Sequence, residues 1–114
     1  MNAAGPRITI INARRPAGSR TVVVAGELEI GTVPAFQEQI HAILRSVQGE
    51  QLNLDLSTLE FCDLAGLRAL QALESTAVEN AYRLRVTAAA PCLDVILELC
   101  QISAMLGYMP ARKA

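Results

Sequence analysis

The stretch LDLSTLEFCDLAGLRALQAL, residues 54–73, passes from a strand pattern into a helix pattern with almost no loop, and it decides the fold. The segment 52–56, LNLDL, predicts a strand, because apolar and polar side chains alternate along it. From Leu67 to Ala77, apolar residues recur at three- and four-residue steps, which predicts an amphipathic helix over 67–81. The joint therefore places a helix N-terminus directly after a strand.

Two residues at this joint have expected structural roles. Asp63 suits the N-cap of the helix, because its carboxylate can accept a hydrogen bond from a backbone N–H of the first turn, which is worth about 1 kcal/mol. Gly66 in the first turn lowers helix stability by roughly 1 kcal/mol relative to alanine, so another feature should offset that loss. We expect the helix start to approach the loop Glu27–Ile30 closely, which would bring Glu29 beside Ala65.

The segments before the joint repeat the alternation of strands and helices. RITIINA (7–13) and TVVVAG (21–26) predict a hairpin with a turn at 14–20. The second strand is continuously apolar, which indicates a strand covered on both faces. The loop 27–32 then leads into a helix that Thr32 caps and that ends near residue 49.

The segments after the joint complete one α/β unit. RLRVTAA (83–89) predicts a strand, PCLDVILELCQI (91–102) a helix with proline in its first turn, and AMLGYMP (104–110) a short edge strand. The order β-β-α-β-α-β-α predicts a sheet with helices packed on it, in which right-handed crossovers make neighbouring strands parallel. We expect a single domain at 7–110, with loose termini at 1–6 and 111–114.

The composition limits the classes of function. The chain has 114 residues, of which 52 % are hydrophobic, so one domain can bury a core. Ten basic and eleven acidic residues give a net charge of −1, which offers no electrostatic reason to expect nucleic acid as a partner. No apolar run approaches the roughly 20 residues that span a bilayer, and the first residues lack the pattern of a secretory signal. We expect a cytoplasmic protein that does not insert into the membrane.

No group of residues points to catalysis, a metal site or a cofactor. A Ser/His/Asp set would have to use His41, the only histidine, which lies within a helix pattern. The segment GELEIG has two glycines but lacks the Lys-Ser/Thr of a phosphate-binding loop. The cysteines lack metal-site spacing and are expected to pack in the core; they are Cys62, Cys92 and Cys100. We therefore expect a protein that is not an enzyme.

Two separated motifs are similar to those of a known family. VVVAGELEIGTVPAF (22–36), followed by LNLDLSTLEFCDLAGLRALQAL (52–73), resembles the STAS domain of bacterial anti-sigma factor antagonists. In that family a Gly-Glu-Leu-Asp loop opens onto the first helix, and Asp-Ser-Ser-Gly-Leu begins the second. The similarity continues through 84–91 and 95–106. The resemblance implies a STAS-like (SpoIIAA-like) α/β fold, with a mixed sheet of four to five strands and helices packed on it.

The resemblance also implies a phosphorylation site, from which this chain departs. A family member has a serine at the position of Ala65, where a partner kinase phosphorylates it; the neighbouring serine is Leu64 here, and the loop aspartate is Glu29. Because Ala65 has no hydroxyl, the usual switch cannot operate at this position. Ser57 and Thr58 are nearby in sequence, but a phosphate must reach the helix end to act in the same way.

By the same resemblance, the expected partner is an anti-sigma factor with a serine-kinase fold, whose binding releases a sigma factor. One open alternative is a scaffold subunit of a signalling complex or of an ABC lipid-transport complex, with an ABC ATPase or other STAS proteins as partners. Another is an inert surface, if Leu64 is tucked inward. The expected partner-binding residues are Glu29, Ile30, Thr32, Asp63, Leu64, Ala65, Gly66 and Arg68.

Overall fold

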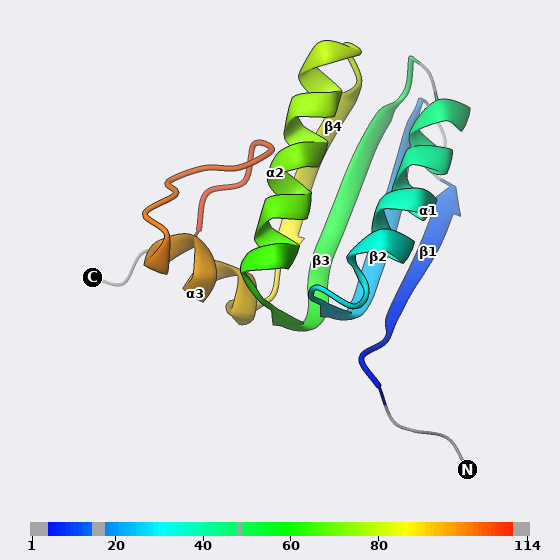
Figure 1. The fold of residues 1–114 in the computed structure, drawn as a ribbon. Coiled ribbons are helices and arrows are strands. Elements are labelled where there is room, and N and C mark those ends of the chain that lie inside the picture. The colour runs from blue at the N-terminus through cyan, green and yellow to red at the C-terminus, as the bar shows by residue number, and fades with distance from the viewer. Residues whose placement is uncertain (1–4, 15–17, 48, 111–114) are drawn as a thin grey trace.

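The computed structural model describes residues 5–14, 18–47 and 49–110, which form one sheet with helices packed on it (Figure 1). The elements in chain order are β1 (Ile8–Arg14), β2 (Ser19–Leu28), α1 (Val33–Ser46), β3 (Gln51–Cys62), α2 (Leu64–Glu79), β4 (Arg83–Ala89) and α3 (Pro91–Leu99). The sheet order is β1-β2-β3-β4, with β1 antiparallel to β2 and the other neighbours parallel. This mixed sheet confirms the fold class predicted from the sequence.

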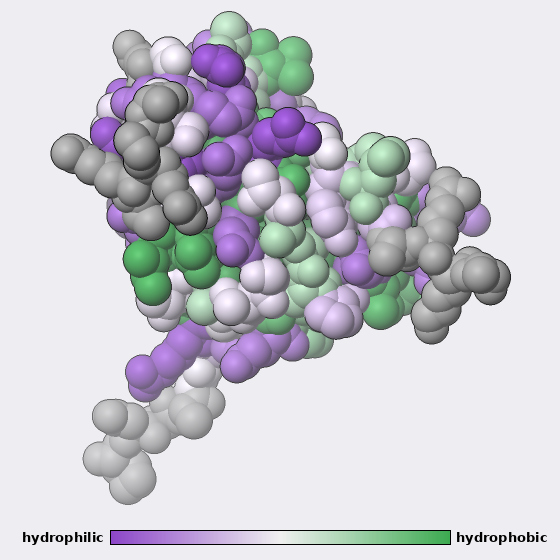
Figure 2. Space-filling model, turned by 180° about the vertical axis from the view of Figure 1, so that it is seen from behind, coloured by the Kyte–Doolittle hydropathy of each residue, from purple (hydrophilic) through white to green (hydrophobic). Residues whose placement is uncertain are grey.

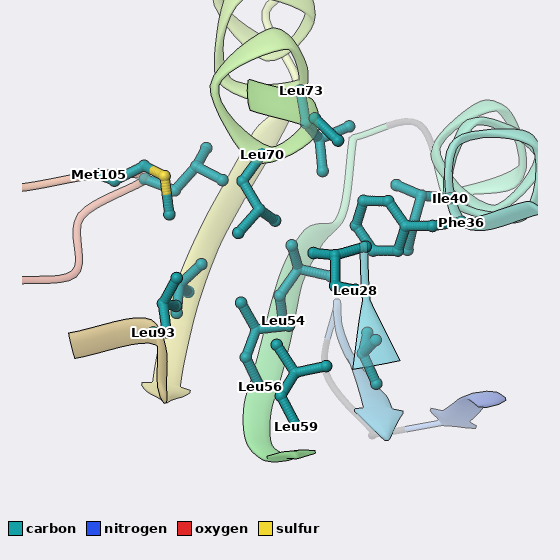
Figure 3. Packing of buried hydrophobic residues seen from close by; sticks show 14 of the residues in the cluster. Leu28, Phe36, Ile40, Leu54, Leu56, Leu59, Leu70, Leu73, Leu93 and Met105 are labelled. Carbon is teal, nitrogen blue, oxygen red and sulfur yellow. The ribbon is translucent and has the colours of Figure 1, made fainter. Parts of the chain in front are cut away.

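The helices lie on one face of the sheet, and the hydrophobic core lies between them and the strands (Figure 1). Phe36 of α1, Leu70 of α2 and Leu93 of α3 are fully buried. They point toward Leu28 of β2 and Leu54 of β3, which are also fully buried (Figure 3). Apart from Phe36, the large fully buried side chains are leucine, isoleucine and methionine. Within the described part of the chain, no helix is long and apolar enough to cross a membrane.

Among the described residues no helix lies on the opposite face of the sheet, so the expectation of a strand covered on both faces is wrong. Val22 and Val24 are fully buried under the helices, whereas Val23 between them points to the open face and is partly exposed. Figure 2 shows hydrophilic and weakly hydrophobic residues over the middle of this face, with strongly hydrophobic groups at its edges. A β-branched run fits either environment, because valine suits any pleated, half-buried surface.

The strands and helices around the joint differ in length from the predictions. β4 has the predicted bounds, but β2 continues through Leu28 into the expected loop, and β3 continues through Cys62. The two strands stay paired up to that point, with Leu28 opposite Cys62, so the backbone remains extended. α2 begins at Leu64 and α3 ends at Leu99, earlier than the sequence suggested at both points.

The segment after α3 does not form the expected edge strand. It makes one isolated bridge between Met105 and Tyr108, and the N–H of Val86 in β4 donates to the Leu106 carbonyl over 2.9 Å. The Tyr108 hydroxyl donates to Asp94 Oδ1 of α3 over 2.5 Å. Individual hydrogen bonds thus tie this segment to β4 and α3, without a continuous ladder. The turn predicted at 14–20 is shorter than expected, because β1 includes Arg14 and β2 begins at Ser19. Its residues 15–17 lie outside the described residues, as do 1–4 and 111–114.

Candidate functional site

The joint between β3 and α2 lies against the end of β2. Cys62, the last residue of β3, is opposite Leu28 in the parallel ladder, and the N–H of Asp63 donates to the Leu28 carbonyl over 3.3 Å. The loop that follows Leu28 leads directly into α1. The start of α2 and the β2–α1 loop therefore meet at the same end of the sheet, the lower end in Figure 1.

Gly66 is the point of closest approach between these two segments. A Cβ atom at Gly66 would lie 2.3 Å from the Leu28 carbonyl oxygen and 3.0 Å from Cys62 Sγ. The neighbouring backbone thus leaves no room for a larger residue, which explains a glycine in the first turn of a helix. This confirms the predicted close approach of the helix start to the segment Glu27–Ile30.

Asp63 caps α2 as the sequence predicted. Its backbone is extended, and its Oδ1 accepts a hydrogen bond from the N–H of Gly66 over 2.8 Å. Because the cap comes directly before Leu64, the helix begins there and not at Leu67. Leu64 and Ala65 therefore belong to the first turn of α2.

Thr32 has a different role from the one that the sequence suggested. It occupies the N-cap position of α1, but its side chain makes no cap hydrogen bond. Its hydroxyl instead donates to the Glu27 carbonyl over 2.7 Å and accepts from the N–H of Glu29 over 3.0 Å. Thr32 is only 5 % exposed, so its side chain holds the shape of the loop from within. The Glu29 carboxylate also bonds inside the loop, accepting from the N–H of Gly31 over 2.6 Å.

Large apolar side chains are exposed at this end of the molecule. Ile30 in the loop is 74 % exposed, and Leu64 at the start of α2 is 47 % exposed. The alternative in which Leu64 is tucked inward is therefore wrong. Ala65 is half-buried and Arg68 is exposed. Gly66 and Thr32 are buried, although the sequence predicted both on the partner-binding surface.

Phe61, which sequence reasoning missed, is 48 % exposed at the same end. Its neighbours Leu59 and Cys62 are both buried, three residues apart, which breaks the alternation of a regular strand. The ladder shows why: Gly26 pairs with Leu59 and the next residue of β2 pairs with Phe61, so Glu60 is an extra residue. Such a bulge changes the face to which later side chains point. We define the α2-start surface as Glu29, Ile30, Glu60, Phe61, Leu64, Ala65 and Arg68.

The thiol of Cys62 lies beneath this surface. Burial, with smaller contributions from Cys92 and Asp63, raises the pKa of Cys62 to about 12, so the group is a neutral thiol near pH 7. Burial also raises the pKa of the half-buried Cys92. The expectation of core packing holds for Cys62 but is wrong for Cys100, which is exposed at the end of α3. Among the described residues, no group of His, Cys, Asp or Glu side chains is arranged to hold a metal ion.

Ser57 and Thr58 lie on β3, away from the start of α2. The Ser57 hydroxyl donates to Asp55 Oδ1 over 2.5 Å, and the Thr58 hydroxyl donates to the Val24 carbonyl over 3.1 Å. Asp63 comes six positions after Ser57, and six steps at about 3.3 Å each are roughly 20 Å of strand. A phosphate on Ser57 would therefore not lie at the positive end of α2.

Comparisons with known proteins agree with this geometry. A family model described as Mlab, STAS domain, matches residues 11–107 of the chain. A solved structure of an anti-sigma factor antagonist from Mycobacterium paratuberculosis is 26 % identical, with a TM-score of 0.67, over 85 % of this chain and 80 % of that chain. A comparison with curated proteins found no match.

Two further solved structures share the fold at lower identity. The anti-sigma factor antagonist SpoIIAA in its unphosphorylated form is 13 % identical, with a TM-score of 0.64, over 82 % of each chain. An antisigma-factor antagonist STAS domain from Rhodobacter sphaeroides is 16 % identical, with a TM-score of 0.56, over 69 % of this chain and 84 % of that chain.

Proposed function

This chain belongs to the STAS domain family, and from that membership we propose that it is an anti-sigma factor antagonist. It would bind an anti-sigma factor through the α2-start surface and thereby release a sigma factor in the cytoplasm, without catalysing a reaction. The similarity to an antagonist at 26 % identity supports this proposal. We further propose that the functional domain comprises residues 7–110.

The observation that carries the proposal is the exposed apolar character of the first turn of α2. Leu64 is 47 % exposed, and Ala65 is half-buried beside it. Exposed leucine favours association with an apolar partner surface, because docking removes its side chain from water. Neither residue has a hydroxyl, so we propose that the partner, an anti-sigma factor with a serine-kinase fold, cannot phosphorylate this turn. Binding would then be constitutive.

Reconstitution with purified proteins tests this function. The chain is copurified with its partners from the host, and mass spectrometry identifies the partners and any phosphopeptide of residues 57–68. The purified chain is then added to a complex of the recovered anti-sigma factor and its sigma factor. We expect free sigma factor with the wild-type chain and none with Leu64→Glu, which places a charge on the apolar surface. The variant Val78→Glu, at the far end of α2, is the control and should release sigma factor like the wild type.

Two results would contradict the proposal. Failure of the chain to release sigma factor from the complex would exclude antagonist activity against that partner. A phosphate on Ser57 or Thr58 that prevents binding would show that a switch operates on β3, and the proposed constitutive binding would be wrong.

A second proposed function is that of a scaffold subunit in a signalling complex or an ABC transport complex. The absence of a hydroxyl at Leu64 and Ala65 favours it, because a permanent subunit needs no phosphorylation switch. Copurification distinguishes the two functions. Recovery of an ABC ATPase and permease in fixed stoichiometry, with no anti-sigma factor, would support the scaffold.

A further inference from the structure

We infer that the α2-start surface is built for a protein partner that presents an apolar pocket bordered by lysine or arginine side chains. The inference rests on the proposed function only in assuming that a protein docks at this end of the sheet. The inference holds whether that protein is an anti-sigma factor or a transport ATPase.

Three segments each contribute one exposed large apolar residue to this surface. Ile30 comes from the β2–α1 loop, Phe61 from the end of β3 and Leu64 from the first turn of α2. They are 74 %, 48 % and 47 % exposed. Phe61 is an aromatic side chain turned outward by the β3 bulge, and aromatic residues are over-represented among the few that dominate the affinity of an interface. We therefore infer that Phe61 is the main apolar anchor.

Carboxylates flank these apolar residues along the chain. Around the starts of β1 and α2 and the ends of β2 and β3, four acidic and two basic side chains give a net charge of −2. The acidic residues are Glu27, Glu29, Glu60 and Asp63, and the basic residues are Arg7 and Arg68. Within the described residues the ion pair found joins Arg20 and Glu50 at the other end of the sheet, so no salt bridge neutralises this acidic group.

The opposite end of the molecule has the opposite charge. β2, β3 and β4 begin there, and α1 and α2 end there (Figure 1). The basic residues near those ends are Arg20, Arg45, Arg83 and Arg85, and the acidic residues are Glu50 and Glu79. These four basic and two acidic residues give this end a net charge of +2. The overall charge of −1 therefore conceals a separation of charge along the strands.

This charge distribution selects the chemistry of the partner. An acidic rim repels the phosphates of nucleic acids and of anionic lipids, so neither matches the apolar residues at its centre. A protein surface with a basic rim is attracted to it, and the charge separation orients the two molecules as they approach. Contact then removes Ile30, Phe61 and Leu64 from water.

Site-specific photo-crosslinking in the host tests the inference and captures the partner whatever its identity. A benzophenone amino acid replaces Phe61 in one variant and Val78 in the control, since Val78 is 78 % exposed at the basic end of α2. We expect a crosslinked protein from position 61 alone. The crosslinked peptide should lie in a partner surface where apolar residues are flanked by lysine or arginine.

Two results of this experiment would overturn the inference: no crosslink from position 61, whether or not position 78 crosslinks, or a crosslinked surface flanked by acidic residues. The identity of the crosslinked protein tests the proposed function separately. An ABC ATPase with the expected surface would retain this inference and reject the antagonist function.

Binding measurements with the purified crosslinked partner separate the two parts of the surface. Phe61→Ser should weaken the affinity roughly tenfold or more, mainly by faster dissociation. Glu60→Lys should slow association several-fold at low salt and flatten its salt dependence. Glu60 suits this test, because it is exposed and makes no side-chain hydrogen bond with the described residues.

The matched controls for these variants lie at the basic end of α2. Val78→Ser and Glu79→Lys change exposed residues of the same types and should leave affinity and association rate unchanged. Wild-type affinity for Phe61→Ser, or faster association for Glu60→Lys, would overturn the inference. Circular dichroism of each variant confirms that the fold is retained.

Discussion

Ala65 and Leu64 show how two side chains set the chemistry of a helix start. The first turn of a helix has unpaired backbone N–H groups and a partial positive charge, which makes it a suitable place for a phosphate. Asp63 satisfies one of these N–H groups, that of Gly66. With alanine and leucine in the same turn there is no oxygen to carry a phosphate, and an exposed apolar side chain takes its place.

Gly66 leads to a prediction about stability. Gly66→Ala should lower the free energy of unfolding by about 1–3 kcal/mol, because the added methyl would overlap the Leu28 carbonyl. The gain in helix propensity, about 1 kcal/mol, does not compensate for that overlap. Chemical denaturation measures the change. Gly5→Ala is the control, because a Cβ at Gly5 meets no atom within 4 Å. Equal or greater stability of Gly66→Ala would show that the β2–α1 loop moves aside freely.

At the scale of a single element, the bulge in β3 determines which side chains reach the surface. Glu60 is the extra residue, and it allows both Leu59 and Cys62 to point into the core while Phe61 points outward. If Glu60 took a regular place in the ladder, the alternation from Leu59 would bury Phe61 and expose Cys62. The sequence did not reveal this bulge, because a bulge depends on pairing with another strand.

Deletion of Glu60 tests the importance of the bulge. We predict that the deletion lowers the free energy of unfolding by no more than about 1 kcal/mol, because Leu59, Phe61 and Cys62 then alternate regularly, and Leu59 and Cys62 still point into the core. Glu60→Ala keeps the bulge and should change stability by no more than about 0.5 kcal/mol. Thermal and urea unfolding of both variants measure the difference. A loss of several kcal/mol for the deletion alone would contradict this prediction and would show that the packing of β3 needs the bulge.

The segment after α3 gives a prediction about pH. Burial, together with the hydrogen bond to Asp94, raises the pKa of Tyr108 to about 12, above its ordinary value of 10.0. The folded state therefore favours the neutral phenol, and this contribution to stability is present below pH 10 and lost between pH 10 and pH 12. Tyr108→Phe should unfold more easily than the wild type at pH 7, by about 1 kcal/mol. The difference between the two proteins should shrink as the pH rises through that window.

Tyrosinate absorbance and urea unfolding across this pH range provide the measurements. Asp94→Asn is the companion variant, because it removes the negative charge beside the phenol and should lower the pKa of Tyr108. A constant difference between wild type and Tyr108→Phe from pH 7 to pH 12 would contradict the assignment.

At the scale of the whole molecule, periodicity predicted the order of the elements and the interior faces of the helices. Phe36 and Ile40 of α1, and Leu70 and Leu73 of α2, are buried as their spacing indicated. These predictions succeeded because they depend on neighbours along the chain. The single covered face of the sheet depends on contacts between distant segments, so the composition of β2 alone could not reveal it.

The candidate site also has features that the sequence predicted and features that it did not. The cap by Asp63 and the close approach at Gly66 follow from local rules about helix starts, and both were predicted. The internal role of Thr32 depends on how the β2–α1 loop folds back on itself. The exposure of Phe61 depends on the register of two strands. Neither feature leaves a signal in a single sequence.

The domain boundary can be tested on the whole chain. The described elements share one hydrophobic core, so we predict that a fragment of residues 7–110 unfolds in a single cooperative transition. Its unfolding midpoint should match that of the full chain within about 1 °C, because in a domain of this size a loss of about 1 kcal/mol would lower the midpoint by several degrees. Calorimetry measures both. A lower midpoint would show that the terminal residues contribute to the fold.

The pairing of Arg7 with Glu27 determines where a fused polypeptide would emerge. The Arg7 N–H donates to Glu27 Oε1 over 2.7 Å, and the Glu27 N–H donates to the Arg7 carbonyl over 2.8 Å. This holds the start of β1 at the same end of the sheet as the α2-start surface. A tag or reporter joined ahead of Gly5 would therefore be tethered beside that surface at high effective concentration and would compete with a partner. Affinity tags for interaction studies thus belong at the other terminus.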